Sequence, residues 1–270
     1  MRAEARVVAE ADGRGGTRLA VLRGESPLLL RRTGPLGRDE VTVHLVGGAA
    51  GPLRGDELRL DVEVGPGARL AMRSVAAQLA LPGRPGAPPS RLEIHATVAA
   101  GASLRWLPEP LIAAAGCHHL AITHVSVAAG GALLWRDDLV CGRHGEASGD
   151  VRADITIRYS GSTLYRHELA VGPGAPGWSG AAVLGGGRAV GSLILAGPDL
   201  PDPALLGGDA ALMPLAGPGM LATAVGADIR QVRAALDPLC AAAPPRPDLD
   251  PATPNPRPDT DVAGQAPVPV

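Results

Sequence analysis

The sequence predicts a mainly β protein, and three observations favour this fold class. Short apolar or alternating segments, each bounded by glycine or proline, follow one another through roughly the first 200 residues, which is typical of half-buried strands. Glycine (37) and proline (27) are abundant among the 270 residues, which indicates many turns and few long helices. A strand–turn–strand unit also recurs. Together these features predict a layered, solenoid-like β body of stacked hairpins with one or two C-terminal helices.

The expected strands share period-two alternation or a short aliphatic run. They are Leu19–Leu22, Val41–Val46, Leu58–Val64, Leu92–Val98, Leu120–Val127 and Val151–Tyr159. Because only 2% of the residues are aromatic, their core must be aliphatic, and few rings are present for stacking on bases or sugars.

The recurring unit is a strand, a tight turn that contains glycine, and a second strand. In its three copies Leu60–Val64 leads into Gly67–Leu70, Ile94–Val98 into Gly101–Leu104, and His124–Val127 into Gly131–Leu134. Glycine supplies the positive φ that such turns require. Since a lone hairpin is marginal in water, we expect the copies to stack on one shared core, although an ordinary β-sandwich with coincidental spacing is the alternative.

Helix is expected only near the C-terminus. Ala204–Met213 could form a short helix, and Ala227–Leu236 is the better candidate because Asp228 can cap it and Gln231 follows three residues later. Pro238 should end or kink that helix. We therefore expect one β domain with its helix over residues 1–243 and a disordered proline-rich tail over 244–270.

Charge and cysteine content exclude several classes of protein. The formal net charge is -2, so no basic field is present to attract nucleic acid or an anionic membrane. Three cysteines do not form a disulfide framework. The N-terminal residues lack a secretory apolar segment, and no apolar run approaches the ~20 residues that span a bilayer. The expectation is a cytoplasmic protein.

A cluster of soft and borderline metal ligands lies near the middle of the chain. It comprises Cys117, His118 and His119, with His124, Cys141 and His144 downstream. The spacing matches no zinc motif, and adjacent strand residues face opposite ways, so His118 and His119 could share an ion only from a loop. Weak contact with Ni²⁺ or Cu²⁺ is the more plausible metal role. A divergent zinc-dependent hydrolase that uses this cluster remains an alternative.

Several segments, in this order, resemble the urease accessory protein family UreD, also called UreH. Gly51–Leu58 is similar to that family's G-G-x-x-G-G-D-x-L, and Ser74–Gln78 to its T-x-x-A-x-K. Leu107–Ile112 is close to L-P-x-P-x-I, and Asp137–Glu146 is similar to D-x-x-x-x-G-R-x-x-x-G-E with one residue fewer between Arg and Glu. The family's usual aromatic residues after the third motif are replaced here by Ala113–Ala115.

The resemblance implies a non-enzymatic chaperone that helps to load nickel into urease. Its implied partners are UreF-like and UreG-like accessory proteins and the urease apoprotein, and its implied metal is nickel in transit with no permanently bound cofactor. The residues themselves offer candidate transient ligands for that nickel, namely the acids at the ends of apolar strands, Asp56, Glu57, Asp137 and Glu146, with His118 and His119 as weak ones. The matching motifs add Pro108, Glu109, Gly142 and Arg143 as binding residues.

The chemistry of the acidic residues is compatible with this role. Carboxylates with water can carry Ni²⁺ without trapping it, whereas a Cys/His cage would hold it too tightly to pass it on. The alternative is that these acids cap turns or pair with Arg54 and Arg143. A β-solenoid binding module with no metal role is the remaining interpretation.

Overall fold

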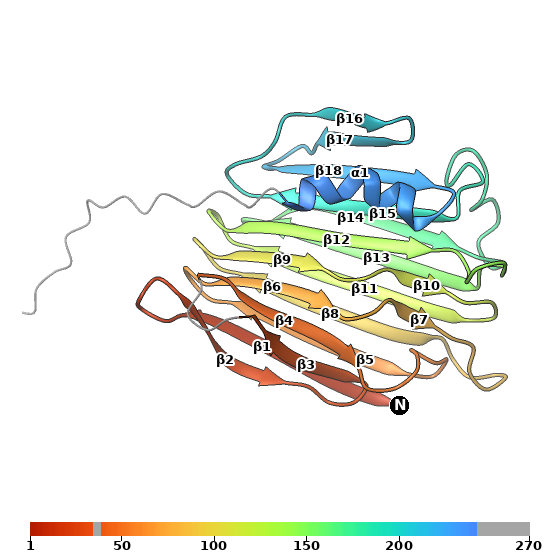
Figure 1. Cartoon of the computed structure of the whole chain (residues 1–270), viewed down its shortest axis with the longest axis horizontal. Helices are drawn as coiled ribbons and strands as arrows, with labels where there is room; N and C mark the ends of the chain where they lie inside the picture. The colour runs from red at the N-terminus through yellow and green to blue at the C-terminus, as the bar shows by residue number, and fades with distance from the viewer. Residues whose placement is uncertain (35–38, 242–270) are drawn as a thin grey trace, which may run out of the picture.

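Every strand that the sequence predicts lies in one of two β-sheets in the computed structural model, which describes residues 1–34 and 39–241. Sheet A contains, in spatial order, β14 (Ser162–Val171), β13 (Asp150–Tyr159), β11 (His118–Val127), β8 (Ser90–Val98), β5 (Glu57–Val64), β1 (Arg2–Ala11) and β2 (Thr17–Arg23). The layered, mainly β architecture is therefore confirmed (Figure 1).

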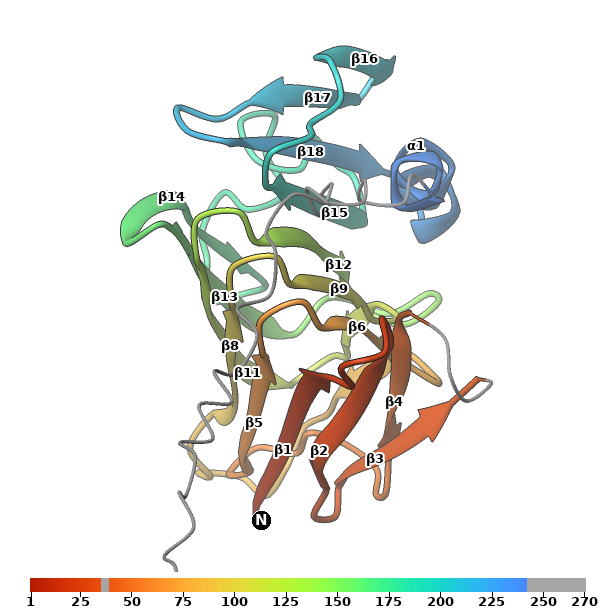
Figure 2. The ribbon, with the colours of Figure 1, turned by 90° about the vertical axis from the view of Figure 1, so that its left-hand side faces the viewer.

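Sheet B is the longer of the two sheets. It contains, in spatial order, β16 (Ala204–Gly207), β17 (Ala210–Pro214), β18 (Gly219–Gly226), β15 (Ala189–Ala196), β12 (Ala132–Val140), β9 (Ser103–Leu107), β6 (Arg69–Ser74), β4 (Val41–Gly47) and β3 (Leu28–Thr33). The short strands β10 (Leu111–Ala113) and β7 (Gln78–Ala80) extend it beside β12. Figure 2 shows the two sheets facing one another, with sheet B continuing beyond β14.

The recurring unit places its two strands in different sheets. The first strands, β5, β8 and β11, pair in parallel within sheet A, and the second strands, β6, β9 and β12, pair in parallel within sheet B. The units therefore stack as layers, and the expectation that each unit is a hydrogen-bonded hairpin was wrong. Gly67 and Gly101 have the expected positive φ, whereas in the third turn Gly130 takes that conformation in place of Gly131.

The core between the sheets is aliphatic, as the composition predicts. Leu58, Leu60, Val62 and Val64 alternate inward from β5 and are almost fully buried, while the residues between them face outward. Each such burial contributes about 1.5–3 kcal/mol. The aromatic exception is the stacked pair Trp106 and Trp135, whose ring centroids are 4.8 Å apart.

Helix α1 (Ile229–Ala241) covers the outer face of sheet B near β12, β15 and β18 (Figure 2). The Asp228 carboxylate accepts hydrogen bonds from the backbone amides of Arg230 (2.9 Å) and Gln231 (3.3 Å), so the predicted cap is confirmed. Pro238 does not end the helix, which continues through it to Ala241. Side chains flanking Pro238, those of Asp237 and Cys240, are bound to Arg136 on β12, which holds the last turn in place.

The segment 204–213 is not a helix. Its alanine, leucine and methionine content favours helix, but Gly207 and Gly208 lie at its centre, and each glycine in a helix interior costs about 1 kcal/mol relative to alanine. The segment forms the antiparallel pair β16 and β17 instead, and β17 pairs with β18. Consequently, the described residues contain one helix, and it is too short to cross a bilayer. The predicted tail, 244–270, lies outside the described residues.

Candidate functional site

Strand β12 carries two adjacent carboxylates that face opposite sides of sheet B. Asp137 lies on the same face as Trp135, which is packed in the core between the sheets, whereas Asp138 lies on the face that α1 covers. The predicted divergence of neighbouring strand side chains is therefore confirmed. The two carboxylates have different surroundings and can do different chemistry.

Asp137 is a carboxylate inside the β body. Its Oδ2 accepts a hydrogen bond of 2.8 Å from the indole nitrogen of Trp135. Burial raises the pKa of Asp137 to about 7; the Trp135 hydrogen bond opposes this rise, and the neighbouring charge of Asp138 adds to it. At neutral pH this carboxyl can therefore exchange a proton or accept a cation.

Hydroxyl side chains continue from Asp137 across sheet B. Asp137 pairs in register with Ser192 on β15, and Ser192 pairs with Thr223 on β18, so the three side chains share one face. Tyr165 of sheet A is also close, since burial and then the charge of Asp137 raise the pKa of its phenol to about 12. Three partly buried side chains with oxygen atoms thus follow one another across this face of sheet B.

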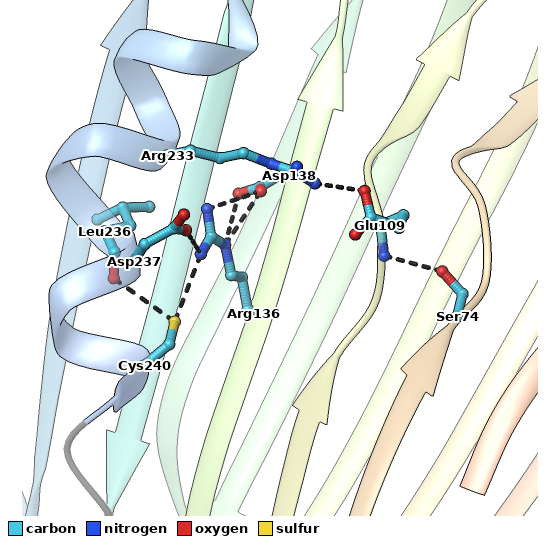
Figure 3. Close-up of polar contacts among 8 residues, drawn as sticks. All are labelled: Ser74, Glu109, Arg136, Asp138, Arg233, Leu236, Asp237 and Cys240. Atoms are coloured by element: carbon cyan, nitrogen blue, oxygen red, sulfur yellow. Dashed lines mark hydrogen bonds and ion pairs between the residues drawn. The ribbon is translucent and has the colours of Figure 1, made fainter. Parts of the chain in front are cut away.

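Asp138 belongs to a polar network that fastens α1 to sheet B (Figure 3). The side chains of Arg136 and Asp138 are only 7% and 2% exposed and form an ion pair of 2.9 Å. Arg136 also donates to Asp237 Oδ1 at 2.5 Å and to Cys240 Sγ at 3.4 Å. Burial alone would lower the pKa of Arg136, but the bonds from Asp138 and Asp237 outweigh it and raise the pKa.

A second link from α1 reaches the loop that follows β9. Arg233 on the helix pairs with the Glu109 carboxylate, and the Glu109 backbone amide donates to Ser74 Oγ at 2.8 Å (Figure 3). The predicted binding residue Glu109, with Pro108 before it, is thus tied to both α1 and β6. Gly191 on β15 lies beneath the helix, because a Cβ there would approach Asp138 Oδ1 and Val232 Cγ1 to 2.5 Å.

The turn before β5 holds the carboxylates of Asp56 and Glu57. Asp56 is buried and accepts hydrogen bonds from the N-terminal amine of Met1 (2.7 Å) and the backbone amide of Leu53 (2.9 Å). Glu57 is exposed and accepts from Arg2 Nε at 2.9 Å. Both carboxylates therefore have partners that account for their positions.

Glu146 closes the turn that follows β12. It accepts hydrogen bonds from Arg143 Nε (2.8 Å) and Arg143 Nη2 (2.7 Å), and these bonds lower the pKa of Glu146 to about 2. Gly142 has a φ of +84°, and a Cβ there would lie 2.5 Å from the Glu146 carbonyl oxygen. Gly142 and Arg143 therefore shape this turn, and Arg143 holds the Glu146 carboxylate.

The Cys/His cluster does not converge. His119 is fully buried, its Nδ1 lies 2.9 Å from Ser90 Oγ, and burial lowers its pKa to about 4, while His118 faces the other side of β11. Burial likewise raises the thiol pKa of Cys117 and of Cys141 to about 11. Over residues 1–34 and 39–241, no group of three or more His, Cys, Asp or Glu side chains could hold a metal ion.

Comparison with known proteins identifies the family. The chain matches the UreD urease accessory protein family over residues 1–258. The chain belongs to the UreD family.

Curated UreD proteins from actinobacteria are similar over most of their length. Urease accessory protein UreD 3 of Streptomyces griseus is 49% identical over 243 residues, which covers 88% of this chain and 95% of the relative. UreD of Streptomyces avermitilis is 46% identical over 242 residues, with coverage of 88% and 95%. UreD of Parafrankia sp. is 43% identical over 262 residues, with coverage of 88% of both chains.

The motifs that suggested the UreD family lie at different places in this UreD-family chain. Asp56 and Glu57 precede β5, Asp137 is inside the body, and Glu146 lies in the turn after β12, each with its own partner. They do not form one ligand set within the described ranges.

The sequence analysis did not predict two sets of interacting side chains. Arg136, Arg233 and Asp237 fasten α1, and the available signal was the alternation in Trp135–Asp138, which places Arg136 on the same face as Asp138. His95 and His124 were also missed as a pair, although they occupy corresponding positions in two copies of the recurring unit.

Proposed function

We propose that this UreD-family chain is a non-catalytic scaffold of urease maturation, and that nickel in transit meets Asp137 inside its β body. Membership of the urease accessory family supports a role in urease maturation. The observation that carries the nickel step is the environment of Asp137, a carboxylate between two sheets whose pKa is raised to about 7.

Asp137 suits a site that must release its ion. Oxygen ligands hold Ni²⁺ less tightly than thiolate and imidazole ligands, so an ion on a single carboxylate can move on. Ser192 and Thr223 extend the same face with hydroxyl oxygens, and the indole of Trp135 fixes the carboxylate. Asp137 itself is only partly exposed, which restricts access to small species.

We assign structural roles to the other predicted ligands. Asp56, Glu57 and Glu146 are neutralised by the Met1 amine, Arg2 and Arg143, and those cations would have to leave before a metal could bind. The buried imidazole of His119 is held by Ser90. Asp137 has no such cationic partner in the described residues, which is why the proposal centres on it.

The proposed partners are UreF-like and UreG-like accessory proteins and the urease apoprotein. We place the UreF-like partner at α1 and the neighbouring edge of sheet B, where Leu205 on β16 is 87% exposed and Met213 on β17 is 40% exposed. The inner face of α1 is already used against sheet B, since Val232 and Leu236 are fully buried. Three free cysteines are consistent with a reducing, cytoplasmic setting.

The test is co-production of urease with the accessory proteins and one version of this chain. Wild type, Asp137→Asn and Asp154→Asn are compared, with Asp154 as a partly exposed aspartate on β13. We expect Asp137→Asn to lower urease activity at least tenfold while the variant still co-purifies with the UreF-like protein. We expect Asp154→Asn to behave as wild type. Full activity with Asp137→Asn would contradict the nickel step and favour a binding module without a metal role.

The zinc hydrolase alternative makes a different prediction. It requires one tightly bound zinc ion per chain, on ligands drawn from Cys117, His118, His119 and His124. His118 and His119 face opposite sides of β11, and Cys117 donates to the Asp150 carbonyl oxygen at 3.6 Å. Metal analysis of the purified chain decides between the two, because the scaffold proposal expects zinc far below one equivalent.

A further inference from the structure

Two histidines stand side by side on the outer face of sheet A. His95 on β8 and His124 on β11 are direct neighbours in the parallel register, so both side chains point away from the core. Their ring centroids are 5.2 Å apart and the ring planes are tilted by 43°. Parallel pairing of the two strands holds them at this spacing without contribution from a loop.

This spacing matches two imidazoles on one metal ion. With nitrogen–metal bonds of about 2.0–2.1 Å, two imidazole centroids lie roughly 4.5 Å apart at a right angle and roughly 5.2 Å apart at a tetrahedral angle. The observed separation of 5.2 Å is about 0.7 Å above the right-angle value that Ni²⁺ and Cu²⁺ favour, and rotation of the exposed His124 ring can close this difference. The tilt between the rings also removes the face-to-face overlap that would keep an ion from entering between them.

Two carboxylates flank His95, and one of them can orient its ring. Its Nε2 lies 3.3 Å from Glu93 Oε2, and Asp61 on β5 is its lateral neighbour on the other side. A proton on Nε2 directed at Glu93 leaves Nδ1 with a free lone pair, which is the arrangement of metal-bound histidines supported by a carboxylate. Arg59 pairs with Asp61 and Arg91 pairs with Glu93, so both carboxylates are already oriented.

His124 completes the pair from the other strand. It is exposed, and its ring makes no hydrogen bond to any residue of the described chain, so a ring nitrogen is available to a ligand. Its lateral neighbour on β13 is Thr156, a neutral residue that adds no competing charge. Neither histidine contributes to the core clusters, so the fold itself does not account for the pairing.

We propose that His95 and His124 form a surface binding site for a divalent late transition-metal ion of the Ni²⁺ or Cu²⁺ type, with Glu93 as the orienting carboxylate. Imidazole suits these ions, and Cu²⁺ binds more tightly than Ni²⁺ at a given nitrogen site. Water fills the remaining coordination positions, because the described residues supply no third strong ligand. The site is therefore open to solvent, and its metal ion can exchange.

This site is independent of the proposed passage through Asp137. His95 and His124 face outward from sheet A, whereas Asp137 faces the interior from sheet B. Asp137→Asn should leave binding at the histidine pair unchanged, and loss of the pair should leave the raised pKa of Asp137 unchanged. Failure of either proposal thus does not decide the other.

The test uses the full chain, any affinity tag removed, with Ni²⁺ and Cu²⁺ salts as probes. Calorimetric titration with Ni²⁺ should show a saturable site that weakens at least tenfold in His95→Ala and in His124→Ala. The control is His167→Ala, an exposed histidine on β14 whose ring neighbour is Tyr165 at 6.0 Å, and it should stay within twofold of wild type. Equal weakening in the control would overturn the proposal.

A spectroscopic readout separates ligation from a change in folding. The electron paramagnetic resonance spectrum of the Cu²⁺ complex should show splitting from two nitrogen ligands in the wild type. The double variant His95→Ala/His124→Ala should lose that splitting while its circular dichroism and melting temperature stay unchanged. Retention of a two-nitrogen spectrum in the double variant, or absence of saturable binding in the wild type, contradicts the assignment.

Discussion

The guanidinium of Arg136 on β12 donates to the carboxylate of Asp237 on α1 at 2.5 Å, although 101 positions separate the two residues in sequence. The same guanidinium is paired with the buried Asp138. This three-residue contact joins the C-terminal helix to the strand that also carries Asp137. The position of α1 and the position of the Asp137 carboxylate therefore both depend on β12.

Removing Arg136 should destabilise the chain strongly. Arg136→Met leaves the Asp138 carboxylate buried without its cation, which costs about 3–5 kcal/mol of unfolding free energy. Asp237→Asn should cost less than about 1 kcal/mol, because Asp237 is 58% exposed and its pairing is weakened by solvent. Urea unfolding of the two variants measures the difference. Similar stability for both would mean that the Arg136–Asp138 pair does not hold the helix.

The raised pKa of Asp137 should appear as a pH-dependent stability. An unfolded aspartate ionises near pH 4, whereas folded Asp137 ionises near pH 7. Between these values the folded state binds the extra proton, so the contribution of Asp137 falls as pH rises through that window, by about 2–4 kcal/mol in total. Asp137→Asn removes this slope. Parallel stability curves for wild type and variant, measured by urea unfolding across the window, would contradict the shift.

The turn after β12 should tolerate one glycine substitution and not another. Gly142→Ala places a methyl group 2.5 Å from the Glu146 carbonyl oxygen at a positive φ, so we expect a loss of about 2–4 kcal/mol. Gly145→Ala also has a positive φ but meets nothing within 4 Å, and we expect roughly 1–2 kcal/mol. Thermal unfolding of the matched pair gives the comparison. A larger loss in Gly145→Ala would show that contact with Glu146 does not define the turn.

The buried thiols should be unreactive in the folded protein. Burial raises the pKa of Cys117 and of Cys141 to about 11, so few of these thiols are ionised at neutral pH. Iodoacetamide should modify them at least a hundredfold more slowly than in urea, as peptide mass spectrometry would show. Fast modification of folded Cys117 would reopen its role as a metal ligand.

The strands were predictable because the sequence patterns that specify them are local. Alternation in Leu58–Val64 and the glycine turns at Gly67 and Gly101 depend only on nearby residues, and both are found as expected. The sheet to which the second strand of each unit belongs depends on partners 29 or 34 residues away, so the pairing within each unit was misjudged. The segment 204–213 was misjudged for a related reason, because its helical composition is outweighed by pairing with β18.

The candidate site was only partly predictable. The opposite orientation of Asp137 and Asp138 follows from strand geometry alone. Asp56 is paired with the Met1 amine, and Arg136 is paired with Asp237. Both partners are distant in sequence, so no local pattern predicts them. Carboxylates in a motif therefore looked equivalent, whereas their environments make Asp137 the one without a cation beside it.

The central claim is that nickel reaches urease by way of Asp137. The most direct measurement is the nickel content per urease active site, by elemental mass spectrometry, in urease matured with wild type, with Asp137→Asn, with Asp154→Asn, or without this chain. The account predicts near-full nickel with wild type and Asp154→Asn, and less than a tenth of it with Asp137→Asn or with no chain. Full nickel content with Asp137→Asn, under conditions where omission of the chain abolishes loading, would contradict it.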